Sequence, residues 1–217
     1  LATAATDVIT ININDNPSIS DLNTIAGKTA GVVTATLAAT SLSALGSLST
    51  AATDNITITV NDANTTPVNA TDLSALGNKT AGTVTVSNAV AITGNHDQVT
   101  AALVTSGSKV EVGAATVTIN DADGTAITAA ELSAIGGETT GTVTVTNAIA
   151  ISGTPAEVKA ALVTTGSLVE VTDATVNITG NPTISELNDI AAKTSGVVTA
   201  TLAATSLSAL GSLSTAA

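Results

Sequence analysis

Several short segments of the chain alternate between aliphatic residues and threonine. In residues 33–37 the aliphatic residues take the odd positions and threonine the even ones, and residues 83–86 and 142–146 alternate in the same way. Successive side chains of a β-strand point to opposite faces, so each segment predicts a strand with one buried and one hydroxyl-rich face. Further strands are predicted at 8–13, 56–60, 109–112, 115–119, 168–171 and 174–179.

Short helices are predicted between these strands. Ile19, Leu22 and Ile25 are three residues apart, while Val158 and Leu162 are four apart. Both spacings place the side chains on one helix face. Such helices span only two or three turns, so they need tertiary packing for stability.

The helix starts carry capping residues. Residues 128–131 and 154–157 have the Thr-x-x-Glu spacing of a capping box, and Pro155 occupies the favoured first helical position. The same spacing occurs with less favourable residues at Ser18/Asp21, Asn69/Asp72, Asn95/Gln98 and Thr183/Glu186. Glycines that we expect to end helices in a left-handed conformation are Gly27, Gly77, Gly107, Gly136 and Gly166.

The chain is internally repetitive at two offsets. Residues 176–217 repeat residues 11–52, an offset of 165 (176 minus 11), and within these copies 198–217 is identical to 33–52. Residues 128–186 repeat residues 69–127, an offset of 59 (128 minus 69). We therefore predict one continuous repeat array over residues 1–217, in which 1–47 and 48–68 are partial units.

Strand, helix and strand in succession normally give parallel pairing with a right-handed crossover. The predicted fold class is a repeat solenoid, in which parallel β-strands stack coil on coil with short capped helices between them. The alternative is an all-β right-handed β-helix, with the capped segments as irregular corners.

Composition supports a stacked-repeat interior. Phe, Tyr, Trp, Cys and Met are absent, yet 44% of the residues are apolar, so the core consists of small aliphatic side chains. The net charge of −12 argues against binding to nucleic acid, whose phosphates would be repelled. No apolar run is long enough for a transmembrane helix. The sequence shows no polar end repeats, which indicates continuation or end-to-end stacking.

The repeat phrases LSALGNKTAGTVTVSNAVAITG and LSAIGGETTGTVTVTNAIAISG resemble the very long tandem-repeat surface proteins of bacteria, of the marine cyanobacterial type. The resemblance covers most of the chain but contains no catalytic motif. It implies an extracellular or cell-surface location and an elongated structural role. It carries over no site residues.

Calcium is the ligand that the acidic turns favour. Asp15, Asp62, Asp121 and Asp123 follow predicted strands, among Asn and Gly residues, and hard cations need several oxygen ligands. The piece from Asp121 to Gly124 resembles the start of a calcium loop but lacks the distal bidentate glutamate. The alternative is that Asn, Asp and Gly are simply the favoured turn residues.

Catalysis has little support in the sequence. The only histidine, His96, begins a predicted helix and corresponds to Pro155 in the sister repeat, so we expect an exposed first-turn position. No strained nucleophile motif is present, and we predict that the chain is not an enzyme. Paired threonines, such as Thr34 and Thr36, leave an ice-binding face as a further alternative.

The sequence therefore predicts a structural repeat protein. It would form an extracellular filament, sheath, stalk or surface layer by stacking and homotypic self-association with identical chains. The alternatives are an adhesin, a calcium-stiffened spacer module or an ice-binding solenoid.

Overall fold

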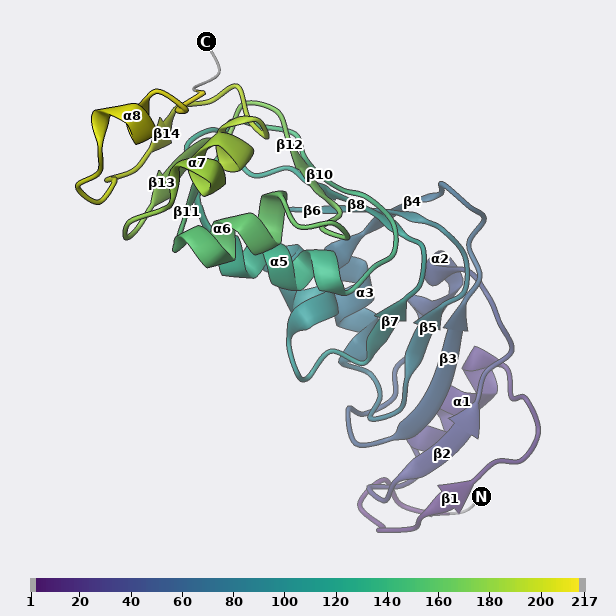
Figure 1. Ribbon diagram of the computed structural model, residues 1–217. Coiled ribbons are helices and arrows are strands. Elements are labelled where there is room, and N and C mark those ends of the chain that lie inside the picture. Colours follow the sequence, from purple (N-terminus) through teal and green to yellow (C-terminus); the bar gives the residue numbers. More distant parts are fainter. Residues whose placement is uncertain (1–2, 215–217) are drawn as a thin grey trace. The chain divides into compact units, whose positions relative to one another are not determined.

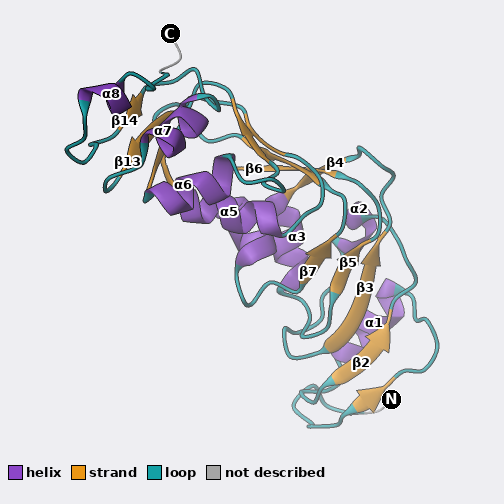
Figure 2. Ribbon diagram, viewed as in Figure 1, coloured by secondary structure: helices purple, strands orange, loops and turns teal. Residues whose placement is uncertain are grey.

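The computed structural model describes residues 3–214 (Figure 1). The chain divides into two compact units. The first comprises residues 1–92 and 98–115, and the second comprises residues 93–97 and 116–217. Residues 1–2 and 215–217, which include the start of the predicted partial unit and the end of the second copy, lie outside the described part. Each unit contains parallel strands with short helices between them (Figure 2).

The first unit contains a five-stranded parallel sheet. Its strands lie side by side in the order β1 (Ile11–Asn12), β2 (Val33–Thr36), β3 (Asn55–Val60), β5 (Val84–Val86) and β7 (Val110–Val112). Ile58 lies opposite Val84, and Val84 lies opposite Val110, which is an offset of 26 at each step (84 minus 58, and 110 minus 84). Two short strands, β4 (Pro67–Asn69) and β6 (Ala91–Gly94), are also neighbours.

The second unit contains two parallel ladders. In one, β8 (Thr116–Ile119), β10 (Val143–Val145) and β12 (Val169–Val171) are adjacent in that order. In the other the order is β9 (Ala126–Thr128), β11 (Ala150–Gly153), β13 (Thr175–Ile178) and β14 (Val198–Thr199). Val117, Val143 and Val169 share one row, which again gives an offset of 26 (143 minus 117, and 169 minus 143).

Helices fall between the strands along the chain. The α-helices are α1 (Ile19–Ala26), α2 (Leu42–Leu45), α3 (Ala70–Gly77), α4 (His96–Val99), α5 (Ala129–Gly137), α6 (Pro155–Leu162), α7 (Ile184–Ala191) and α8 (Leu207–Leu210). A π-helical turn, η1 (Thr100–Val104), continues α4. Because the capped segments are helices and not irregular corners, the all-β alternative is wrong.

The core is made of aliphatic side chains, as composition predicts. The strand faces that carry valine, isoleucine and leucine are buried, while most of the intervening threonines are partly or fully exposed. On the helices, Leu22, Val99 and Val158 are fully buried. The predicted alternation of strand faces and the apolar helix stripes are therefore confirmed.

The predicted side-chain caps are confirmed at four helices, and the cap predicted for a fifth, α3, is absent. Full capping boxes begin α5 and α6, with Pro155 at the first position of α6. Thr183 and Glu186 also form a full box at α7. Ser18 caps α1 with its hydroxyl, whereas Asn69 precedes α3 without a side-chain hydrogen bond to its backbone.

The prediction of left-handed helix stops is wrong for four of the five glycines. Only Gly166 has a positive φ, of 99°. Gly27 ends α1 at φ −68° and ψ −3°, and the following amides bond back with the tighter i→i+3 spacing, as Lys28 does to Ile25. The helix end at Gly27 therefore tightens into a 3₁₀-like turn and contains no left-handed residue. Gly77 and Gly136 are the last and next-to-last residues of α3 and α5.

Candidate functional site

The most regular polar feature of the molecule is a buried threonine followed two residues later by glycine. We call this pair the Thr-x-Gly clamp, and it occurs at Thr29/Gly31, Thr80/Gly82, Thr139/Gly141 and Thr194/Gly196. Each of the four threonines is at most 8% exposed. In each clamp the glycine N–H donates to the threonine hydroxyl, over 2.8–3.0 Å.

The second clamp shows what the hydroxyl does. Thr80 Oγ1 accepts from the Ile56 N–H (2.8 Å) and lies within donating distance of two carbonyls, those of Ile56 (2.8 Å) and Asp54 (3.0 Å). Those partners belong to the strand that precedes the clamp by one coil. One buried side chain thus bonds polar backbone groups of the preceding coil, and the Asp54 carbonyl also accepts from the Ala81 N–H over 2.7 Å.

The glycine of the clamp is required by a close backbone approach. A Cβ atom on Gly82 would lie 2.5 Å from the Ile56 carbonyl oxygen, and one on Gly196 would lie 2.3 Å from that of Ala174. No side chain fits at such distances. The clamp was missed from sequence, although its signal is visible as KTAG, KTAG, ETTG and KTSG, which begin at positions 28, 79, 138 and 193.

A second device joins a helix start to an aspartate of the following coil. Asp62 Oδ2 accepts from the backbone N–H of Leu42, the first residue of α2, over 2.7 Å. Asp121 Oδ2 accepts from the backbone N–H of His96, the first residue of α4, also over 2.7 Å. A carboxylate at a helix N-terminus satisfies an amide without an intrahelical partner and faces the positive end of the helix dipole.

The third member of this series lacks both halves of the pair. The first residue of α6 is Pro155, which has no N–H, and the position that corresponds to Asp121 in the next repeat (121 plus 59) is Gly180. Gly180 lies beside the proline ring. A Cβ atom placed on this glycine would lie 3.8 Å from Cδ of Pro155. Within this series of three, aspartate is present at the two helix starts that offer an N–H and absent at the one that begins with proline.

His96 occupies a partly enclosed position, so the prediction of an exposed first-turn residue is wrong. Its side chain is 14% exposed, and Nδ1 lies 2.8 Å from Oδ1 of Asp121, whose side chain is 6% exposed. Nε2 lies 3.3 Å from Oδ1 of Asp97. The physical reason is Asp121, which bonds both the backbone and the ring of the histidine.

A histidine oriented by a carboxylate also occurs in nucleophilic triads. Here the carboxylate makes a backbone bond that Asp62 makes equally well to Leu42, where no imidazole exists. The shared role is to fix a helix start, and the imidazole is an addition to it. Nothing in this geometry requires a reacting group.

Three of the four aspartates predicted as calcium ligands accept backbone hydrogen bonds. Asp62 and Asp121 cap helices as described, and Asp123 Oδ1 accepts from the Ala148 N–H over 3.0 Å. The backbone carbonyl of Asp121 also accepts from the Asn147 side chain. Asp15 lies on the exposed surface after β1. Within residues 3–214 no three His, Asp or Glu side chains gather as a metal site. Calcium binding stays a prediction.

The pKa values of the three capping glutamates are lowered from the ordinary glutamate value. The backbone N–H of Thr128, and then its hydroxyl, lower the pKa of Glu131. The corresponding bonds from Thr154 and Thr183 lower the pKa of Glu157 and Glu186 in the same way. Each carboxylate accepts two hydrogen bonds that favour its charged form.

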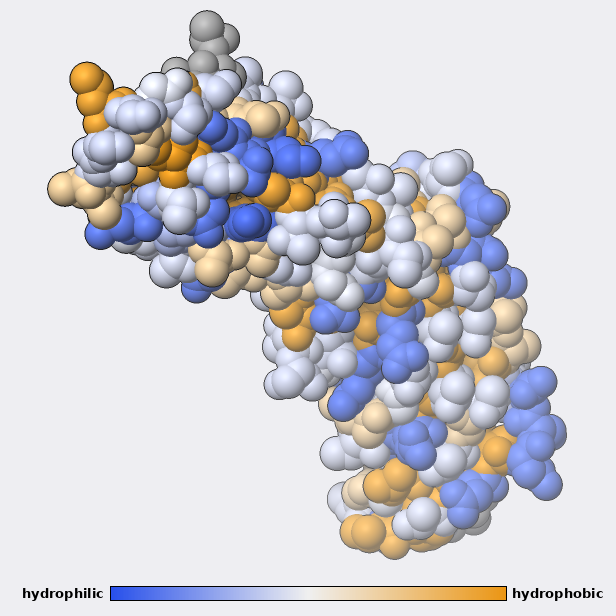
Figure 3. Space-filling model, viewed as in Figure 1, coloured by the Kyte–Doolittle hydropathy of each residue, from blue (hydrophilic) through white to orange (hydrophobic). Residues whose placement is uncertain are grey.

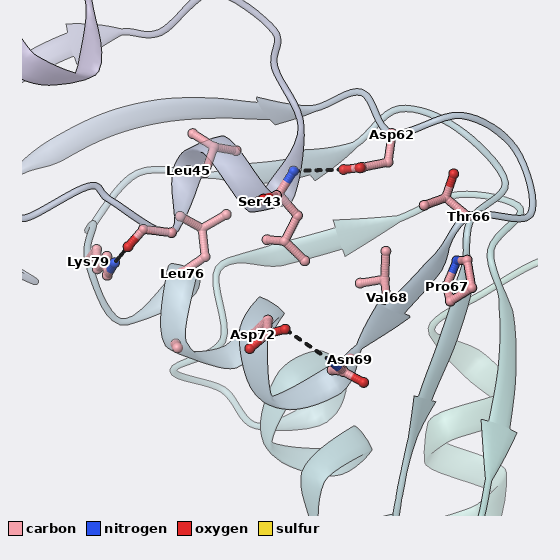
Figure 4. Close-up of a pocket in the computed structure, with 13 residues that line it drawn as sticks. Ser43, Leu45, Asp62, Thr66, Pro67, Val68, Asn69, Asp72, Leu76 and Lys79 are labelled. Carbon is pink, nitrogen blue, oxygen red and sulfur yellow. Dashed lines mark hydrogen bonds between the residues drawn. The ribbon is translucent and has the colours of Figure 1, made fainter.

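A shallow groove of about 550 Å³ lies between α2 and α3 in the first unit (Figure 4). Apolar side chains such as Leu76 and Val68 line it together with three charged residues. Each charged group already has a partner in the chain. Asp62 bonds the Leu42 N–H, Asp72 bonds Asn69, and Lys79 Nζ donates to the Gly46 carbonyl over 2.9 Å. Each charged group of the groove is therefore held by a neutral hydrogen-bond partner of the chain.

The threonine rows are short. Thr36 lies opposite Thr57, and Thr59 lies opposite Thr85, but the next residue in that second row is Glu111. The corresponding row of the other unit also ends on a glutamate. Ice binding, which needs an extended regular array, stays an alternative prediction.

Comparison of the chain with protein-family models, with curated proteins and with solved structures returns no match. Among the helices of residues 3–214, none combines the length and the apolar character needed to cross a membrane.

Proposed function

We propose that this chain is a segment of an elongated extracellular repeat scaffold, built as a solenoid of parallel strands and short helices, with no catalytic role. It would contribute to a filament, sheath, stalk or surface layer by stacking and self-association. The single observation that carries the proposal is the parallel strand register that both units share, with successive strands paired at offsets of 21 to 26 residues. That register puts Ile58, Val84 and Val110 in one row, and Val117, Val143 and Val169 in another.

A shared register supports a scaffold because each coil contacts mainly its neighbours. The polar devices follow the same rule. The Thr-x-Gly clamps and the Asp-capped helix starts join positions roughly one coil apart, and every charged group in the groove forms a hydrogen bond within the chain. The buried polar chemistry is thus used for stacking. The extracellular location is proposed from the resemblance to bacterial surface repeats.

Electron microscopy of the native assembly tests this proposal. We expect thin, elongated structures in preparations of the complete protein, with a length that scales with the number of repeats. A compact, monodisperse monomer as the native form of the complete protein would overturn the proposal.

A further inference from the structure

The chain presents the same sequence in two different environments. Residues 33–52 and 198–217 are identical. In the first copy Leu45 is 0% exposed and Leu48 is 2% exposed, whereas their counterparts Leu210 and Leu213 are 39% and 36% exposed. Leu207 is 86% exposed. Figure 3 shows apolar surface over the segment of β14 and α8. Because the sequences are the same, the difference lies in what covers them.

The first copy is covered by β3 and the residues that flank it, and α2 is also contacted by α3 and by Lys79, whose Nζ donates to the Gly46 carbonyl. Thr34, Ala35 and Thr36 pair in parallel with residues 55–57. The Leu37 N–H donates to the Thr57 carbonyl over 3.0 Å. Two aspartates complete the contact, since Asp54 Oδ1 accepts from the Val33 N–H (2.8 Å) and Asp62 Oδ2 accepts from the Leu42 N–H (2.7 Å).

A close duplicate of this covering segment exists elsewhere in the chain. Residues 3–15 read TAATDVITININD, and residues 50–62 read TAATDNITITVND. Their local structures agree as well. Asp7 Oδ2 accepts from the Ala4 N–H over 3.0 Å, just as Asp54 Oδ2 accepts from the Ala51 N–H over 2.8 Å. Residues 3–15 therefore share sequence and a local hydrogen bond with residues 50–62, the segment that covers the first copy.

In the first copy, β3 pairs with β2 through one of its edges. The corresponding edge of the duplicate, residues 7–15, pairs with no strand of residues 3–214. Within residues 3–214, β1 pairs only with β2 and forms the edge of its sheet. Ile9 is 36% exposed, although its counterpart Ile56 is fully buried, and Val8 is 81% exposed. The open face at residues 198–214 therefore carries the sequence that is covered at residues 33–49. The open face at residues 7–15 carries a close copy of the segment that covers it, residues 54–62.

We infer that residues 197–214 of one chain bind residues 7–15 of a second copy, in the register that β2 and β3 adopt within the chain. Thr199, Ala200 and Thr201 would pair with Val8, Ile9 and Thr10. The Leu202 N–H would donate to the Thr10 carbonyl. These contacts repeat pairs observed between β2 and β3.

The same register assigns roles to two aspartates. Asp7 Oδ1 would accept from the Val198 N–H, as Asp54 Oδ1 does from Val33. Asp15, for which sequence favoured calcium, would accept from the Leu207 N–H at the start of α8, as Asp62 does from Leu42. Both carboxylates would then accept backbone N–H hydrogen bonds that favour their charged form at the contact.

Such a contact joins two different faces, so it is head-to-tail and each addition leaves one face of each kind open. The inference rests on the proposed scaffold function and gives it a specific interface. It is tested separately, because the register of the contact can be wrong even if the complete protein is a filament.

The chain contains no cysteine, so engineered cysteines report this interface alone. Thr36 and Thr57 are directly opposed and exposed in the internal contact, and their counterparts are Thr201 and Thr10. We would mix Thr10→Cys chains with Thr201→Cys chains at about 0.15 M salt, which screens the net charge, and oxidise them. Paired Cα positions on neighbouring strands, about 4.8 Å apart, fall in the range that a disulfide spans.

We expect a disulfide-linked dimer of twice the 20.8 kDa chain mass. An Asn12→Cys partner, two positions out of register, should give at least about tenfold less of it because the sulfur atoms are shifted by roughly 6.6 Å. Adding Leu207→Arg to the Thr201→Cys chain should also suppress the dimer, while Ala160→Arg on the exposed side of α6 should not.

Equal yields from the Thr10 and Asn12 variants would overturn the inference. So would the absence of a crosslink at chain concentrations up to about 1 mM, where even weak contacts are populated; the face at 197–214 would then belong to another occupant, such as further repeats of a longer chain. Filaments in native material without this crosslink would leave the scaffold proposal intact. A compact native monomer would remove that proposal whatever the crosslink yields.

Discussion

Replacing Thr80 by valine tests the Thr-x-Gly clamp most directly. Valine keeps nearly the same shape but removes a hydroxyl that accepts from the Ile56 and Gly82 N–H groups, both at 2.8 Å, in a side chain that is 2% exposed. An unpaired buried polar group costs about 1–3 kcal/mol. Gly82 is only partly buried, so its N–H recovers some hydration. We expect Thr80→Val to lower the free energy of unfolding by about 2–4 kcal/mol.

Urea unfolding followed by far-ultraviolet circular dichroism measures this, because the chain lacks the tryptophan and tyrosine that fluorescence would need. Thr57→Val is the matched control, since Thr57 is exposed on β3 and its replacement should change the free energy by less than about 0.5 kcal/mol. Thr80→Ser keeps the hydroxyl and should cost only about 1 kcal/mol for the lost methyl group. If Thr80→Val were no less stable than Thr80→Ser, the reasoning would be refuted.

Two further predictions concern charge. Asp121→Gly alone and His96→Pro alone should each lower the urea unfolding free energy by about 2–4 kcal/mol, because each leaves one partner of a buried charged bond. The double variant has the proline and glycine of the next repeat. Its loss of unfolding free energy should be at least about 1 kcal/mol smaller than the sum of the two single losses. Strictly additive losses would contradict the coupling between His96 and Asp121. The lowered pKa values of Glu131, Glu157 and Glu186 mean that the unfolded chain binds more protons in acid, so their stabilisation is present above the ordinary glutamate pKa of about 4.3 and is lost as pH falls through the folded pKa. The melting temperature should therefore fall between about pH 5 and pH 3, and less steeply in the triple Glu→Gln variant; equal slopes would exclude the capping boxes as the cause.

The features that sequence predicted well are those set within a few residues. Alternation of valine with threonine identifies strands because neighbouring side chains alternate between two faces, and Val143 and Val145 are buried accordingly. A capping box needs only the spacing from Thr128 to Glu131. Internal repetition was also readable, because it requires no knowledge of the fold.

The features that were missed depend on partners far along the chain. The role of Thr80 is defined by Ile56 on an earlier strand, and the position of His96 is defined by Asp121 in the following coil. A pattern within one helix or strand carries no information on such contacts. The helix-ending glycines were misread for a related reason, since Gly136 lies close to a methyl group of Val169 on a later strand, 3.1 Å from a Cβ placed on the glycine.

The duplicated segment shows how folding and assembly can be separated in this chain. Ser41 and Ser206 cap α2 and α8 with nearly the same backbone angles, φ −70° and ψ 152° against φ −72° and ψ 151°, although the first helix is covered and the second is open. The conformation is therefore set within the segment and does not require the covering strand. Binding of a second chain, as inferred above, would therefore need little refolding of this segment, which lowers the ordering cost of association. A preformed face of this kind suits a scaffold that lengthens by adding like to like.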